Sequence, residues 1–327
     1  MQHAPHVVLV AGPGRSGTSL FTGLLSRLGY HVPKPEVSAG RTNPRGFSEP
    51  RWAVDFHNTL LEKAAIAVDD SRPEAWQRAT SVGERKPVYA ELREWLGAQL
   101  AESPRVVVKD PRIGWFLDLY RRVGEDLGAQ TYVVTLLRDP AEVLRSRELA
   151  YGTRTTPSVR ALGWVNMMLG VEEHARDIPH AVVRYADLLT DWQTALTDAG
   201  TALGLDLVTS ATPDQIASAA GLVDPSLLRS AADWSEMEVV PRAEALTRSV
   251  YQTYGDLVGV PDAAALAAGR AALAQAAAEL TAYYDECWEI SSHRRRRLVR
   301  RERRKAVAAE RARVAGEVTD KMDAAGR

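Results

Sequence analysis

The sequence predicts an α/β fold, with helices on both faces of a mostly parallel β-sheet in three layers and a helical C-terminal extension. Short aliphatic runs alternate with longer helical stretches, and the first run leads directly into a glycine-rich turn. The last part of the chain is rich first in alanine and then in arginine. Strands that alternate with helices form βαβ units, whose crossovers make the strands parallel.

Four runs have the β-branched and aliphatic composition of strands buried on both faces. They are Val7–Ala11, Val106–Lys109, Thr131–Leu136 and Ala181–Arg184. Helices are expected at Gly17–Leu28, Arg51–Ala67, Glu84–Ala101, Ile113–Leu127, Pro140–Leu149, Val159–Arg176, Leu188–Leu203, Pro225–Ala231, Arg242–Val258 and Ala263–Asp285. Residues 30–50 contain four prolines and are expected to form a long loop, which in a compact domain is often functional.

Composition excludes several classes of protein. The chain has 327 residues, of which 45% are apolar and 25% charged, as in ordinary globular domains. A single cysteine excludes a disulfide framework and any multi-cysteine metal site. No apolar run has the length of a membrane span, and the N-terminus has no basic region before its apolar stretch, so we expect a cytoplasmic protein.

Charge is distributed unevenly along the chain. Arg294–Arg313 holds eleven basic and two acidic side chains, a local charge of +9, so the rest of a chain whose total is −1 carries −10. This segment fits a solvated helix, a contact with an anionic membrane surface, or a partner protein, and an oligomer is also compatible with it. No aromatic platform accompanies the arginines, so nucleic acid is not expected as a partner.

A glycine-rich turn follows the first expected strand. Gly12–Ser19 reads GPGRSGTS and leads into an amphipathic helix. Such a turn aims several backbone N–H groups at one point, and the N-terminus of the helix adds partial positive charge. The strand before and the helix after it favour phosphate or sulfate binding over a turn that serves only packing.

This turn departs from the nucleotide-kinase pattern at one position. Gly12 and Gly17 have the P-loop spacing, but Thr18 stands where a kinase has the lysine that reaches the outer phosphates. Arg15 instead places a cation inside the turn, which suits a single anionic centre better than an extended Mg-triphosphate. An NTP-dependent small-molecule kinase and a non-catalytic nucleotide-binding scaffold remain alternatives.

A second anion site is expected after the third strand. Arg138 ends that strand, Pro140 starts the next helix, and Ser146 lies two helical turns further on the same side. An arginine fork with a hydroxyl is good phosphate chemistry. The alternative is a surface pair between Arg138 and Asp139.

Five motifs, in this order, resemble the bacterial sulfotransferases that use 3′-phosphoadenosine 5′-phosphosulfate (PAPS). They are GRSGTS at Gly14–Ser19, NPRGFSE at Asn43–Glu49, VKDPR at Val108–Arg112, LRDPAEVLRS at Leu137–Ser146 and VRYADL at Val183–Leu188. The resemblance covers about residues 7–205 and implies the P-loop-like sulfotransferase fold for residues 1–262, followed by an Arg-rich extension over 263–327.

The resemblance implies transfer of a sulfuryl group from PAPS to a hydroxyl or amine, without a metal, leaving 3′,5′-adenosine bisphosphate. It assigns the nucleotide to Gly14, Arg15, Ser16, Gly17, Thr18, Ser19, Arg138, Ser146 and Tyr185. Many members carry Pro where this chain has Gly14. Transfer of this kind passes through a loose transition state, so catalysis consists mainly of positioning and charge stabilisation.

Four residues are candidates for the chemistry itself. Arg15 is expected to neutralise the leaving phosphate, and Lys109 either contacts the transferring sulfonate or pairs with Asp110. Glu49 is the first candidate for the general base, because members of the family carry an acidic residue there, and His57 is the second. Glu36 and Asp55 are lesser candidates.

The acceptor is not specified by the sequence, and a carbohydrate, lipid, phenol or natural-product hydroxyl all fit. The side chains that either line an apolar acceptor site or belong to the core are Tyr151, Trp164, Met167 and Met168. Phe47 and Trp52 flank Glu49 and are expected to contact the acceptor.

Overall fold

A four-stranded parallel sheet forms the centre of the protein. The computed structural model describes residues 4–40, 46–152, 155–227, 232–259 and 261–325. The strands are β1 (His6–Ala11), β2 (Arg105–Lys109), β3 (Gln130–Leu137) and β4 (His180–Arg184), in the order β2-β1-β3-β4. All four predicted strands are confirmed, each extended by one residue at one or both ends.

Helices connect these strands and follow them. They are α1 (Thr18–Arg27), α2 (Arg51–Ala64), α3 (Ala75–Gly83), α4 (Lys86–Glu102), α5 (Leu117–Asp126), α6 (Pro140–Tyr151), α7 (Pro157–His174), α8 (Tyr185–Thr190), α9 (Trp192–Leu203), α10 (Pro213–Ala220), α11 (Pro241–Gly255) and α12 (Ala263–Ala325). Single 3₁₀ turns lie at Ile113–Phe116, Pro225–Leu227 and Trp234–Glu236. The α/β class and the helical C-terminal part are thus as the sequence predicted.

Two helices were missed, and two predicted helices were wrong in extent. Both missed helices, α3 and α10, are short, and α10 starts with a capping box formed by Thr212 and Gln215. The helix predicted over Leu188–Leu203 is interrupted at Asp191, which caps α9 by accepting a hydrogen bond from the Thr194 amide. Of the helix predicted at Pro225–Ala231, a 3₁₀ turn covers Pro225–Leu227, and the remaining residues lie outside the described part.

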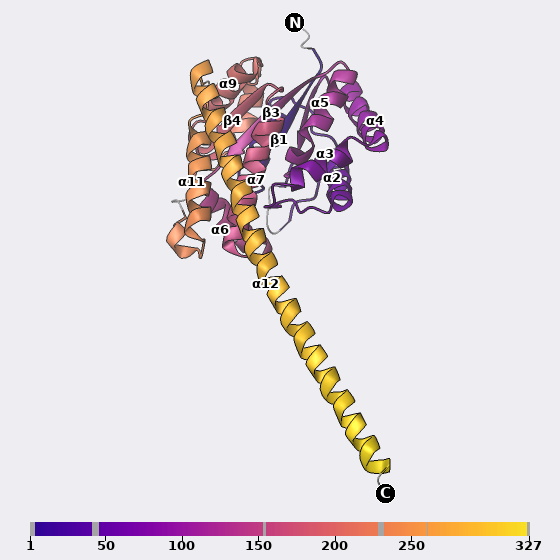
Figure 1. The fold of residues 1–327 in the computed structure, drawn as a ribbon. Helices are drawn as coiled ribbons and strands as arrows, with labels where there is room; N and C mark the ends of the chain where they lie inside the picture. The colour runs from indigo at the N-terminus through magenta and orange to yellow at the C-terminus, as the bar shows by residue number, and fades with distance from the viewer. Residues whose placement is uncertain (1–3, 41–45, 153–154, 228–231, 260, 326–327) are drawn as a thin grey trace. The chain divides into compact units, whose positions relative to one another are not determined.

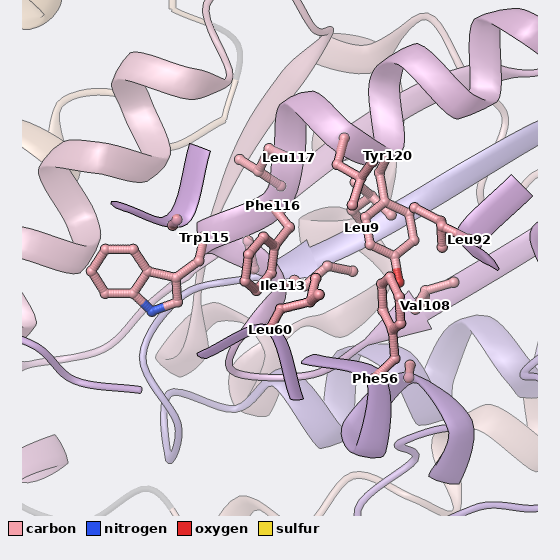
Figure 2. Packing of buried hydrophobic residues seen from close by; sticks show 14 of the residues in the cluster. Leu9, Phe56, Leu60, Leu92, Val108, Ile113, Trp115, Phe116, Leu117 and Tyr120 are labelled. Carbon is pink, nitrogen blue, oxygen red and sulfur yellow. The ribbon is translucent and has the colours of Figure 1, made fainter. Parts of the chain in front are cut away.

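The sheet separates two hydrophobic clusters, which makes the three layers. Successive residues of β1 alternate between them: Val7 and Leu9 face one cluster, and Val8 and Val10 face the other. The first cluster includes side chains from α2 to α5 and α7, and Figure 1 shows α2, α3, α4 and α5 together on one side of the strands. In Figure 2, Leu9 and Val108 pack among aromatic and leucine side chains of this layer. The second cluster is built from α1, α8, α9 and α10.

The carboxyl ends of the strands meet at one edge of the sheet. From β1 the chain crosses to β2 on one side and then to β3 on the other, so the edge beside β1 is a topological switch point. Open α/β sheets bind ligands in the crevice at such a point. The turn after β1, Asp110 after β2, Arg138 after β3 and Tyr185 after β4 all lie at this edge.

Two units are distinguished by the contacts within the chain. The first is Met1–Leu280 and the second is Thr281–Arg327, the remainder of α12. The domain boundary predicted after residue 262 falls just before α12 begins and stays a prediction. The basic segment Arg294–Arg313 lies on α12, largely outside the residues whose side chains are described. In the described part of the chain, no helix is long and apolar enough to cross a bilayer.

Candidate active site at the carboxyl edge of the sheet

The turn after β1 has the backbone of an anion-binding loop. Gly12, Arg15 and Gly17 have φ values of +112°, +77° and +94°, in the left-handed region, and Gly17 is the N-cap of α1. Alternation of left- and right-handed residues turns successive N–H groups toward one concavity, at the positive end of the α1 dipole. For the non-glycine Arg15 this conformation costs of order 1–3 kcal/mol, so surrounding contacts must hold it.

Two of those contacts join distant parts of the chain. The Arg15 Nε donates to Ser146 Oγ of α6 at 3.1 Å, and the Arg15 carbonyl accepts from Arg138 Nη1 at 3.0 Å. Arg138 also pairs through its Nε with Glu142 at 2.8 Å, and its guanidinium carbon lies 4.7 Å from the centre of the Tyr185 ring. The residues predicted to hold the two ends of the nucleotide are therefore in direct contact, and Ser146 contacts Arg15.

The hydroxyl of Ser16 is the clearest mark of a ligand in this loop. Ser16 is fully buried, and its Oγ has no hydrogen-bond partner among the described residues. A buried polar group left unpaired costs about 1–3 kcal/mol. An oxygen of a bound phosphate or sulfonate would satisfy it, and the residues present therefore fit such a group.

Glycine is required at position 17 but not at position 14. A Cβ on Gly17 would lie 2.2 Å from Cδ2 of Tyr185, so that ring packs directly against the start of α1. A Cβ on Gly14 would make ordinary contact with Pro111, at 3.6 Å. A side chain at position 14 would therefore fit beside Pro111, in contrast to position 17.

A buried ion pair lies at the end of β2. Lys109 and Glu49 are 2% and 8% exposed, and Lys109 Nζ donates to Glu49 Oε1 at 2.5 Å. The same Nζ donates to Ser19 Oγ at 3.3 Å and to the Phe47 carbonyl at 3.2 Å. Burial lowers the pKa of Lys109, although the charge and hydrogen bond of Glu49 oppose that effect. The structure thus pairs Lys109 with Glu49, a partner that the sequence did not suggest, and the pair with Asp110 that was considered is not found among the described residues.

Backbone bonds fix the position of Glu49 at the entry to α2. The Val37 amide donates to the Glu49 carbonyl, and the Arg51 amide donates to the Pro35 carbonyl, both at 2.8 Å. Ser48, the residue before Glu49, has a φ of +52°. Such strained residues concentrate at functional sites. Asn43, Pro44 and Arg45 of the same motif lie outside the described residues.

His57 belongs to a separate buried cluster. Its Nδ1 is 2.7 Å from Asp110 Oδ2, its Nε2 is 3.1 Å from the Tyr120 hydroxyl, and its ring stacks on Phe116. Asp110 also accepts from Arg112 through both the backbone amide and the guanidinium. Burial opposes ionisation of Asp110, but the hydrogen bond and charge of His57, with Arg112, outweigh it and lower the pKa of Asp110. Both nitrogens of His57 are thus engaged within the core.

The remaining predicted residues are dispersed. Glu36 pairs with Lys34, and Asp55 is exposed on α2. Trp52 stacks on Phe56 and Trp95. The side chains considered for the acceptor site are placed as follows: Tyr151 is exposed, Met168 is buried in α7, and Trp164 and Met167 line a recess beside Pro13 and Gly14.

Sequence reasoning missed the role of Asp110 and the polar walls of the recess. Side chains of successive residues at a strand end point to opposite faces of the sheet. This alternation could have indicated that Lys109 and Asp110 have different partners. Arg147, which pairs with Asp69 at 2.9 Å, directly follows the motif that ends at Ser146, and Arg160 lies on α7, outside the recognised motifs. No local pattern indicates that either side chain lines the recess.

Comparison with known proteins gives matches to solved structures alone. No family model matches the chain, and no curated protein matches it. The sulfotransferase domain of the Synechococcus PCC 7002 olefin synthase is similar over 78% of this chain and 97% of its own, with a TM-score of 0.45 and 19% identity. Sulfotransferase STF1 of Mycobacterium tuberculosis H37Rv covers 67% of this chain and 71% of its own, with a TM-score of 0.46 and 16% identity.

A third structure is sulfotransferase STF9 of Mycobacterium avium. It is similar over 79% of each chain, with a TM-score of 0.46 and 13% identity. At these identities and TM-scores the likeness carries no functional argument, and we therefore derive function from the site of this chain.

Proposed function

We propose that this protein is a sulfotransferase that moves a sulfuryl group from PAPS to a hydroxyl or amine of a small-molecule, glycan or lipid acceptor. The observation that carries the proposal is the meeting of Arg15 and Arg138 around a loop whose buried Ser16 hydroxyl has no partner among the described residues. Two guanidinium groups at neighbouring strand ends suit a nucleotide with a phosphate at each end of its ribose.

The binding roles follow from position. Arg15 and the N–H groups of Ser16–Ser19 hold the 5′-phosphosulfate, where the α1 dipole also favours negative charge. Arg138 and Ser146 hold the 3′-phosphate. The Tyr185 ring contacts both Arg138 and Gly17. We place it between the sites for the two phosphates of the nucleotide.

Glu49 and Lys109 supply the chemistry. In the free protein the two charges neutralise each other in a site nearly closed to water. When an anionic sulfonate binds next to Ser19, Lys109 Nζ can donate to it, and the Glu49 carboxylate then accepts the proton of the acceptor hydroxyl. The acceptor oxygen forms the new bond to sulfur as the bond to the leaving phosphate oxygen breaks. Arg15 and Lys109 stabilise the charge that develops on that oxygen.

His57 acts on this site through Asp110. Because both its nitrogens are engaged by Asp110 and Tyr120, it holds the end of β2 and thereby Lys109 in position. We therefore assign the base role to Glu49 and a positioning role to His57.

Calorimetric titration and thermal unfolding of the purified protein with adenosine 3′,5′-bisphosphate and with Mg-ATP test the proposal. We expect the bisphosphate to bind in the titration. We also expect it to raise the melting temperature, because a ligand that binds only the folded state stabilises that state. Arg15→Ala should lose most of that affinity. Binding of Mg-ATP in place of the bisphosphate would refute the proposal in favour of a kinase.

A further inference from the structure

Most of the large apolar side chains on the surface lie in one region of the first unit. In the described part of the chain, six such side chains are exposed, and two of them, Trp288 and Ile290, lie on α12 in the second unit. The other four come from the end of α6, the start of α7 and the residue before α11: Leu149 (76% exposed), Tyr151 (60%), Val159 (39%) and Val240 (47%). Single exposed apolar side chains are normal, but several in one place indicate a binding surface.

Two ion pairs join the end of α6 to the other two segments. Arg145 lies one turn before Leu149 on the same face of α6, and it pairs with Glu236 of the segment before α11 at 2.5 Å. Glu148, the residue before Leu149, pairs with Arg160 of α7 at 3.2 Å. Leu149 therefore lies close to both of these segments.

The start of α7 also contacts the segment before α11. The Val240 amide donates to the hydroxyl of Ser158, the residue before Val159, at 2.9 Å. A small buried cluster holds the three segments together from beneath, and it consists of Ala141, Leu144, Ala161 and Trp234. The four exposed side chains thus share one supported surface. We call it the apolar corner, and it is made of Leu149, Tyr151, Val159 and Val240.

The apolar corner adjoins the anion-binding loop. Ser146, one turn before Leu149 on α6, accepts a hydrogen bond from Arg15 of the loop at 3.1 Å. Arg160, at the start of α7, lines the recess beside Gly14. A molecule whose reacting hydroxyl lies at the loop can therefore extend its remaining part over the apolar corner.

The chemistry of the corner favours an uncharged chain. Arg145 and Arg160, the arginines of the two ion pairs, are already neutralised by Glu236 and Glu148. These arginines therefore leave no free charge for an ionic group. An alkyl chain gains about threefold to fourfold in affinity for each CH₂ group that it buries against apolar side chains.

We propose that the apolar corner binds the alkyl or acyl chain of the acceptor, so that the acceptor is a lipid-like alcohol or amine and not a free sugar. The word acceptor rests on the proposed function, whereas the binding of an apolar chain rests on the corner itself. The chain lies across Leu149 and Val240, and the hydroxyl lies at the loop.

Methyl NMR of the full chain tests this proposal. The protein is labelled at its leucine and valine methyl groups and titrated with 1-butanol, 1-hexanol and 1-octanol, and with glucose as the polar alcohol. Each titration is run with and without saturating adenosine 3′,5′-bisphosphate. We expect the three alkanols, and not glucose, to move the Leu149 and Val240 resonances, which Leu149→Ser and Val240→Ser assign. Affinity should rise about threefold for each added CH₂ group.

A double variant measures the contribution of the corner. Leu149→Ser combined with Val240→Ser should bind 1-octanol about tenfold more weakly, because two apolar contacts are lost. Its melting curve and its affinity for the bisphosphate should stay the same, since both side chains are exposed. Ile290→Ser is the matched control, because Ile290 is also exposed but lies in the second unit. It should leave the affinity for 1-octanol unchanged.

Three results would overturn the proposal: an affinity that does not depend on chain length, equal shifts with glucose, or shifts caused by raising the protein concentration without alkanol. The last would show that a second copy of the protein covers the corner. Sulfuryl transfer from PAPS to glucose without any alkanol-dependent shift would support the proposed function and refute the corner. Chain-length-dependent shifts in a protein that binds no adenosine 3′,5′-bisphosphate would support the corner and refute the proposed function.

Discussion

The ends of β2 and β3 both carry cations, but they are built differently. At the end of β2, Lys109 and Asp110 are both buried, and each is paired inside the protein, with Glu49 and with His57. At the end of β3, Arg138 is partly exposed and donates to a main-chain carbonyl as well as to Glu142. Buried ions depend on their partners because their desolvation is costly, whereas a partly exposed one is compensated by water.

Substitutions at the two strand ends should therefore affect different properties of the protein. Changes at the β2 end should alter chemistry and stability together, since each removes one partner of a buried pair. Changes at the β3 end should alter nucleotide affinity and leave the fold intact. Four substitutions test this contrast, in order of decreasing effect.

Glu49→Gln should have the largest effect. Loss of the general base is expected to lower kcat by about 10²–10⁴-fold, while the affinity for adenosine 3′,5′-bisphosphate stays the same. Steady-state kinetics with PAPS and calorimetry measure the two quantities. Glu36→Gln is the control, because Glu36 belongs to the same loop but pairs with Lys34. A near-normal kcat for Glu49→Gln would remove Glu49 from the base role.

Asp110→Asn should destabilise the fold by about 3–5 kcal/mol at neutral pH, because it leaves His57 and Arg112 without their buried partner. The folded-state pKa of Asp110 lies below its ordinary 3.8. The stability from its ionisation is therefore present above pH 3.8 and is lost as pH falls through the lower folded value. Urea unfolding at several pH values should show the difference from wild type shrinking below pH 3.8. A constant difference would contradict the ionised pair.

Arg138→Ala should weaken binding of the bisphosphate by about 1.5–3 kcal/mol, as expected for a hydrogen bond to a charged group. Its effect on unfolding should be about 1 kcal/mol, from the lost bond to the Arg15 carbonyl, and smaller than that of Asp110→Asn. Arg145→Ala, an exposed arginine of the same helix region paired with Glu236, serves as the control for calorimetry. Equal affinities for both variants would show that the β3 end does not hold the nucleotide.

Gly17→Ala should have the smallest effect of the four, a destabilisation of about 1–2 kcal/mol from the left-handed backbone, with added displacement of Tyr185. Gly14→Ala is the matched control, since a Cβ there makes ordinary contact with Pro111. Thermal unfolding of the two variants compares them. If they melt alike, Tyr185 does not pack on the loop as described.

The fold and the strand-end motifs could be predicted because they depend on local patterns. Aliphatic runs mark all four strands, and the turn after Ala11 and the positions of Arg138 and Ser146 occur at fixed spacings from them. The Asp110–His57 pair and the recess of Trp164 and Arg160 could not be predicted in this way. Their partners are brought together by the packing of α2, α6 and α7 on the sheet, and no short-range pattern encodes that packing.

If the loop beside Ser16 holds the phosphosulfate as proposed, it should also accept other small tetrahedral anions. Sulfate or phosphate in a buffer is then expected to occupy the N–H groups beside Ser16 and to compete with the nucleotide. Apparent affinities and rates for this protein should thus vary with the choice of buffer salt. Chloride-based solutions are the appropriate baseline, and sulfate as precipitant would favour crystals of an anion-filled state.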